Sequence, residues 1–145
     1  MTSRGFTLLV SILLLLLGCV APPASHHHGA AGPRASTTPP LFDDLGGYHR
    51  AITTRSPQAQ PYFDQGLRLV YGFNHYEAQA AFREAARLDP ECAMCAWGLA
   101  LTYGSNYNSP TDAGRETQAY EAIQKAIALE SGASPQEQAL IEATA

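Results

Sequence analysis

Residues 59–90 read AQPYFDQGLRLVYGFNHYEAQAAFREAARLDP, and this stretch decides the fold. Apolar residues follow the 3.6-residue period of an α-helix in both halves, and Gly72 separates the two halves. Small residues stand where two antiparallel helices would cross closely, and large residues fill the seam between them. Pro90 ends the second helix because proline cannot continue a helix interior. The stretch therefore predicts a hairpin of two helices.

The hairpin also carries the spacing of a known repeat. Its key residues fall at the offsets of a tetratricopeptide unit, a helix-turn-helix repeat with a period of about 34 residues. These packing residues are Tyr62, Gly66, Leu69, Ala78, Phe82, Ala85 and Pro90. Four runs, residues 56–60, 62–67, 71–75 and 89–95, resemble the beginning of large exported bacterial tetratricopeptide lipoproteins. The resemblance implies an all-α superhelix of antiparallel hairpins with a binding role and no assigned chemistry.

The helical domain is expected to cover residues 57–145 and to hold about two and a half repeats. The first repeat spans about residues 59–92, and an irregular second repeat spans about residues 93–132. The first helix of a third repeat occupies about residues 135–145. Repeat arrays usually need three or more units and a polar capping helix. We therefore expect this chain to be the N-terminal part of a longer protein, or a truncated product.

The second repeat is irregular because its two helices are separated by an insertion that begins at Gly104. Ala119, Ile123 and Ala126 reproduce the spacing of the first repeat, but later than a regular repeat would place them. Cap residues predict where the helices begin. The expected starts are Pro57 or Gln60 for the first helix, Asn74 for the second, Asp89–Pro90 for the third and Ser134, with Glu137 completing a capping box, for the last.

The first 19 residues are expected to be a lipoprotein signal peptide. Arg4 gives a positive start, and residues 6–17 form an apolar core that is too short to span a bilayer. Residues 16–19 resemble a lipobox, which implies lipid on Cys19 and attachment to a membrane without crossing it. Val20 follows the cysteine, and in a diderm bacterium this favours the outer membrane, facing the periplasm. The alternative is an ordinary secretory signal, cut a few residues after Cys19.

Two non-helical segments follow the signal peptide. Residues 20–40 are rich in Pro, Ala and Ser with His26–His28, and they lack the apolar residues that would offset ordering entropy. They predict a disordered linker, and three neighbouring histidines in it do not make a fixed metal site. Residues 41–56 predict an extended, turn-rich segment whose apolar residues lie against the first helix. The sequence of that segment indicates little about function.

The composition argues against nucleic acid as a partner. The chain carries a net charge of −4 at pH 7, and removal of a leader that contains Arg4 makes the remainder more acidic. Basic runs with interleaved aromatic residues do not occur in the sequence. An acidic surface repels a phosphate backbone, so we expect no nucleic acid partner.

Cys92 and Cys95 form a C-x-x-C pair at the expected start of a helix, where the helix dipole lowers the pKa of a thiol. A structural disulfide, two separate buried thiols, and a redox or metal function are all open for this pair. Haem attachment would need a histidine at position 96, where Ala96 stands. Zinc would need two further ligands at matching spacing. A structural role is favoured.

The first helix of each hairpin supplies candidate partner-binding residues, since the resemblance implies that this helix lines the concave side. The candidates on these helices are Phe63, Leu67, Tyr71, Trp97 and Leu101. Apolar residues at helical spacing serve equally as core between repeats, and that alternative is favoured for most of them. Asn106, Tyr107 and Asn108 in the inserted loop are further candidates, because exposed amides and a phenol can satisfy the backbone groups of a peptide.

These patterns predict a non-catalytic module of the cell envelope that binds a protein or a peptide. A Ser/His/Asp set, paired carboxylates or a glycine-rich phosphate loop cannot be assembled from the sequence, so no catalytic residue, cofactor or metal is expected. The alternative from a different class is a thiol-redox or metal-handling envelope protein that uses Cys92 and Cys95.

Overall fold

The described part of the chain is helical apart from its connecting segments. The computed structural model describes residues 38–106 and 112–145, and these form five α-helices, one short 3-10 helix and no β-strand. The elements are α2 (Ala59–Tyr71), α3 (His75–Leu88), α4 (Ala93–Tyr103), α5 (Ala113–Leu129), η1 (Glu130–Gly132) and α6 (Pro135–Thr144). The all-α expectation is confirmed for these residues. The expected signal peptide, the lipidation site Cys19 and nearly all of the linker lie outside them.

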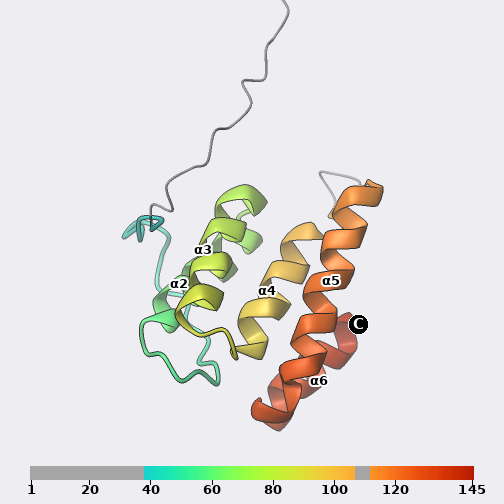
Figure 1. Cartoon of the computed structure of the whole chain (residues 1–145). Coiled ribbons are helices and arrows are strands. Elements are labelled where there is room, and N and C mark those ends of the chain that lie inside the picture. The colour runs from blue at the N-terminus through green and yellow to red at the C-terminus, as the bar shows by residue number, and fades with distance from the viewer. Residues whose placement is uncertain (1–37, 107–111) are drawn as a thin grey trace, which may run out of the picture. The chain divides into compact units, whose positions relative to one another are not determined.

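The helices form two layers (Figure 1). Helices α2, α4 and α6 lie in one layer, where α2 contacts α4 and α4 contacts α6. Helices α3 and α5 lie in the other layer, and each packs against the helices before and after it in the chain. The short turn at residues 72–74 makes α2 and α3 antiparallel. The predicted hairpin is therefore present, and the next helices continue the same up-and-down path.

Phe82 of α3 lies at the centre of the core. Its side chain is fully buried, and its ring lies edge-on to Phe63 of α2 with the ring centroids 5.6 Å apart. Glycines on both neighbouring helices make room for the ring: a Cβ atom on Gly66 would lie 2.7 Å from it, and one on Gly98 would lie 2.3 Å away. Three helices therefore meet closely at one aromatic ring, because α2 and α4 carry no side chain at these two points.

The residues predicted to pack between the helices differ in burial. Ala78 and Ala85 of α3 are fully buried, and Leu69 of α2 is buried as well. Tyr62 is partly buried against the core, whereas Pro90 is exposed in the turn after α3. The small residues therefore lie where the helices approach each other. Pro90 takes no part in the core, and its role is confined to the turn that follows α3.

The helix starts follow the sequence pattern with one exception. Helix α2 begins at Ala59, between its two expected starts, and the predicted capping box at Ser134 and Glu137 is present at the start of α6. The expectation that Asp89 caps the third helix is wrong, since α4 begins at Ala93 with Cys92 as its N-cap residue. The Asp89 side chain instead accepts hydrogen bonds from residues 54, 55 and 91.

A strained residue ends α2. The amide of Phe73 donates to the Val70 carbonyl, and the amide of Asn74 donates to the Leu69 carbonyl, which is the bonding of a Schellman motif. That motif needs a left-handed residue at the position of Phe73, whose φ is 59°. Glycine is the usual residue there, yet Gly72 stands one position earlier with an ordinary φ of −82°. The Phe73 side chain remains 57% exposed and touches His75 edge-on.

Replacing Phe73 by glycine is expected to raise the free energy of unfolding by about 1 kcal/mol, because the left-handed conformation penalises a side chain. Thermal unfolding of the two proteins measures the change. Gly72→Ala is the matched control, since φ at Gly72 suits alanine and the nearest atom to its Cβ would be the Arg68 carbonyl oxygen at 3.4 Å. A lower melting temperature for Phe73→Gly would mean that the contact with His75 outweighs the strain.

Candidate functional site

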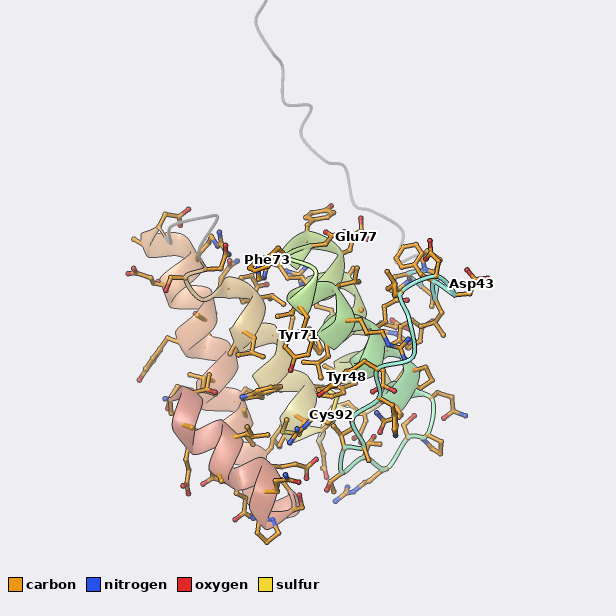
Figure 2. All side chains as sticks on the ribbon, turned by 180° about the vertical axis from the view of Figure 1, so that it is seen from behind. Asp43, Tyr48, Tyr71, Phe73, Glu77 and Cys92 are labelled. Atoms are coloured by element: carbon orange, nitrogen blue, oxygen red, sulfur yellow. A yellow bond between two sulfur atoms is a disulfide. The ribbon has the colours of Figure 1, made fainter. Side chains whose placement is uncertain are left out.

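An extended segment, residues 40–55, lies along α2 and is held there by polar side chains (Figure 2). We call it the strap. At its first end, Gln65 of α2 bonds to the backbone on both sides of Leu41. The Gln65 Oε1 atom accepts from the Phe42 amide at 2.7 Å, and its Nε2 atom donates to the Pro40 carbonyl at 2.9 Å. One side-chain amide thus accepts from one backbone N–H and donates to one backbone C=O of an extended chain, which are the same groups that a neighbouring β-strand would bond.

The middle of the strap is held by Asp64 and Gln60, one turn apart on α2. Asp64 accepts from the Arg50 amide at 3.1 Å and pairs with the His49 ring at 2.7 Å. Gln60 accepts from the Ile52 amide and donates to the Arg50 carbonyl. Gln60 also donates to Asp64, which fixes the orientation of both side chains. His49 is therefore part of this contact.

The last part of the strap reaches two carboxylates outside α2. Glu137 of α6 accepts from the Thr53 amide at 2.7 Å and from the Thr53 hydroxyl at 2.6 Å. Asp89, in the turn after α3, accepts from the Thr54 hydroxyl at 2.6 Å and from the Arg55 amide at 2.7 Å. Both carboxylates are buried, so their charge is compensated by these donors rather than by water. The strap therefore joins α2 to the start of α6.

Hydrogen bonding keeps both carboxylates ionised. Burial acts to raise the pKa of Asp89, but the hydroxyl of Thr54 and the amides of Arg55 and Glu91 outweigh it and hold the pKa below its ordinary value. The same balance holds for Glu137. Burial acts to raise its pKa, and the donors from Thr53 and Ser134 bring the pKa below the ordinary value. The bonds to the strap are thus charge-assisted at neutral pH.

We refer to the side chains that hold the strap as the clamp. The clamp consists of Gln60, Asp64, Gln65, Arg68, Asp89 and Glu137. Arg68 belongs to it because its Nε atom donates to the Tyr48 carbonyl at 2.6 Å. Most clamp contacts go to backbone N–H and C=O groups of the strap. The clamp therefore holds the strap mainly through the backbone of the strap.

An aromatic pair lies beside the clamp. Tyr48 of the strap meets Tyr71 at the end of α2 edge-on, with the ring centroids 5.6 Å apart (Figure 2). Burial and a hydrogen bond with Tyr48 raise the pKa of Tyr71. Tyr71 is nevertheless 60% exposed and Tyr48 is 48% exposed. The two rings therefore contact each other while much of each side chain remains exposed to solvent.

The other candidates on the first helix of each hairpin lie deeper. Phe63 and Leu67 are fully buried, and they belong to the core rather than to an exposed surface. Trp97 is 7% exposed, and its indole N–H donates to the Thr144 hydroxyl of α6 at 2.9 Å. Leu101 is partly buried against the core. Among these five, only Tyr71 presents most of its side chain to solvent.

The inserted loop is described only in part. Asn106 is partly buried, while Tyr107 and Asn108 lie outside the described residues.

Cys92 and Cys95 are joined by a disulfide at the start of α4. Cys92 is 2% exposed and Cys95 is fully buried. The Cys92 sulfur also accepts a hydrogen bond from the Cys95 amide, which caps the helix. Exchange with an external thiol needs access to a sulfur atom, and burial denies it here. Within residues 38–106 and 112–145, no group of three His, Cys, Asp or Glu side chains is placed to hold a metal ion.

Removing the disulfide with Cys92→Ala/Cys95→Ala is expected to lower the free energy of unfolding by about 2 kcal/mol, the chain-entropy value for so short a loop. Chemical denaturation of the variant and of the wild type measures the difference. Dithiothreitol should leave the bond intact in the folded protein and reduce it in denaturant. Rapid reduction of the folded protein would instead favour the redox alternative.

Comparison of the chain with protein-family models, curated proteins and solved structures finds no match. No helix among the described residues is both long and apolar enough to cross a membrane. The strap and the clamp are therefore the features of this chain that bear on its function. The sequence carried one indication of them, because the polar residues of α2 lie on one side of the helix: Gln60, Asp64, Gln65 and Arg68.

Proposed function

We propose that this chain is a non-catalytic scaffold that binds an extended segment of a protein or peptide. The observation that carries the proposal is the clamp, whose side chains bond to the backbone of an extended segment. Each such bond contributes about 0.5–1.5 kcal/mol, and bonds to ionised groups contribute more. Several such hydrogen bonds along one peptide would hold it by its backbone, so the contact would tolerate different side chains in the peptide.

The two layers of helices support the finer assignment to a tetratricopeptide superhelix. Alternate helices of such a repeat line one face, and α2, α4 and α6 share one layer here. The close contacts at Gly66, Ala78 and Ala85 agree with the spacing that defines the repeat. The partner would then lie on the layer of α2, α4 and α6, next to Tyr71.

The cell envelope is the proposed location. The sequence of residues 1–19 supports export and a lipid on Cys19, and the acidic net charge supports a partner other than nucleic acid. A catalytic or redox role has weaker support, because the sulfur atoms of Cys92 and Cys95 are paired and buried. The protein would act at the outer membrane by holding a partner, with no cofactor of its own.

A photo-crosslinking amino acid at position 71 tests the proposal in living cells. Tyr71 lies next to the clamp, whereas Tyr76 of α3 lies in the other layer and is equally open, at 68% exposed against 60%. We expect a crosslinked partner from position 71 and not from position 76, with the protein otherwise unchanged. Equal labelling from the two positions, or none from position 71, would refute a partner on this face.

A further inference from the structure

The strap is attached by hydrogen bonds more than by packing. Leu41 is 50% exposed and Tyr48 is 48% exposed, whereas Phe63 and Leu67 on the neighbouring helix are fully buried. Only Leu45 and Ile52 of the strap pack, partly buried, against the core. The hydrophobic contribution to strap binding is correspondingly small, since it scales with the apolar area removed from water.

Open hollows adjoin both ends of the strap. One of about 220 Å³ is lined by Leu41 and Phe42 together with polar side chains of α2. Another, of about 290 Å³, lies between Thr53–Arg55, the turn after α3, and the connection from α5 to α6. Both ends of the strap therefore border solvent-accessible space, and they are not enclosed as a layer of the core would be.

The central core contact is made by residues of the helices. Phe82 of α3 packs against Phe63 of α2, and Gly66 and Gly98 leave room for its ring. The clamp side chains Gln60, Asp64 and Gln65 are carried by α2 itself, so their spacing is fixed by the helix. Removal of the strap would therefore leave a row of polar groups ready to accept another extended chain.

The specific contacts define the chemistry of a chain that could replace the strap. Tyr48 supplies an aromatic ring to Tyr71, and His49 supplies a ring nitrogen to Asp64. Thr53 supplies a backbone amide and a hydroxyl to Glu137. A matching ligand is an extended peptide that has an aromatic residue, then an adjacent basic or imidazole side chain, then a hydroxyl residue about four positions further on.

We propose that the clamp is a binding site for an extended peptide of this chemistry, and that the strap occupies the site until such a peptide displaces it. This proposal rests on the proposed function and adds its regulation. The strap is a competitor within the same chain, so it is always present at high effective concentration. A partner must therefore either bind more tightly than the strap or find the strap already released.

The test loosens the strap without touching the clamp. Arg50→Pro/Thr53→Pro in the full chain removes the two amides that bond to Asp64 and Glu137, together with the Thr53 hydroxyl that bonds to Glu137. The matched control is Ala51→Pro, because the Ala51 amide makes no hydrogen bond to the clamp. The probe is a fluorescent peptide with the sequence of residues 40–55. The control probe is the same peptide with both prolines.

We expect the double-proline variant to bind the peptide at least about tenfold more tightly than the wild type, since 1.4 kcal/mol of released competition gives that factor. Ala51→Pro should behave like the wild type, and the control probe should bind none of them. Circular dichroism should show unchanged helix content in the double-proline variant. Hydrogen exchange should show fast amides in residues 40–55 and slow amides in α2.

The remaining outcomes separate this inference from the proposed function. Equal binding to the wild type and the double-proline variant would overturn competition by the strap and leave the scaffold function standing. Loss of helix content in the variant would make the strap part of the fold and overturn the inference. An open strap with no peptide binding would overturn the clamp as a peptide site, and crosslinking from position 71 would then decide the function alone.

Discussion

Phe82→Ala is expected to lower the free energy of unfolding by about 3–5 kcal/mol, the range for a large side chain removed from a packed core. A domain of this size has only about 5–15 kcal/mol of stability, so the variant should lose much of it. The physical reason is the position of the ring. The ring is fully buried against Phe63. It fills the space that Gly66 and Gly98 leave open because they carry no side chain.

Urea denaturation followed by circular dichroism measures the loss for Phe82→Ala. Tyr76→Ala is the control on the same helix, because Tyr76 is 68% exposed and its removal should change stability by less than about 0.5 kcal/mol. Similar midpoints for the two variants would contradict the placement of Phe82 at the centre of the core.

Gly98→Ala tests the same contact from the opposite side. Its new methyl group would lie 2.3 Å from the Phe82 ring, so the ring or the helix must move. Phe82→Leu should recover part of the loss in the Gly98→Ala background, because a smaller side chain makes room for the methyl group. Independent effects of the two changes would show that the residues do not touch, since residues in contact couple by about 0.5–3 kcal/mol.

The helices and much of the core could be predicted because their causes are local. Apolar periodicity, Gly66 with Ala78 and Ala85, and the Ser134 capping box each act within a few turns of helix. Gly98 did not stand out in the sequence. Its role depends on Phe82, which lies in another helix, and a glycine within an apolar helix is not informative by itself.

The sequence predicts that the strap lies against the first helix, but the clamp contacts that hold it could not be predicted because they are polar and join residues that are distant in sequence. Thr53 and Glu137 are 84 residues apart, and no periodicity relates a backbone amide to the carboxylate that accepts from it. The sequence predicts a local capping box for Glu137, and the box is present, but it uses only part of the acceptor capacity of the carboxylate. The prediction that Asp89 caps a helix is wrong for the same reason. A pattern of neighbouring residues cannot reveal donors such as Thr54 and Arg55, which are distant in sequence.

Glu137→Gln is expected to lower the free energy of unfolding by about 2 kcal/mol, although the two side chains have the same shape. Glu137 accepts from the Thr53 amide, the Thr53 hydroxyl and the Ser134 amide. Glutamine has a single acceptor oxygen, so its NH₂ group must face a donor that the carboxylate satisfied. Glu142→Gln on the same helix is the control, because Glu142 is exposed.

The free energy of unfolding measured at acid pH is a second test of the role of the Glu137 carboxylate. The pKa values of Glu137 and Asp89 are lower in the folded protein than their ordinary values near 4. Their contribution is therefore complete above the unfolded pKa of about 4, and it is lost as the pH falls through the lower folded values. We expect the wild type to lose stability below about pH 4 more steeply than Glu137→Gln, so that the two proteins converge. Parallel pH profiles would show that the Glu137 carboxylate does not hold the strap by its charge.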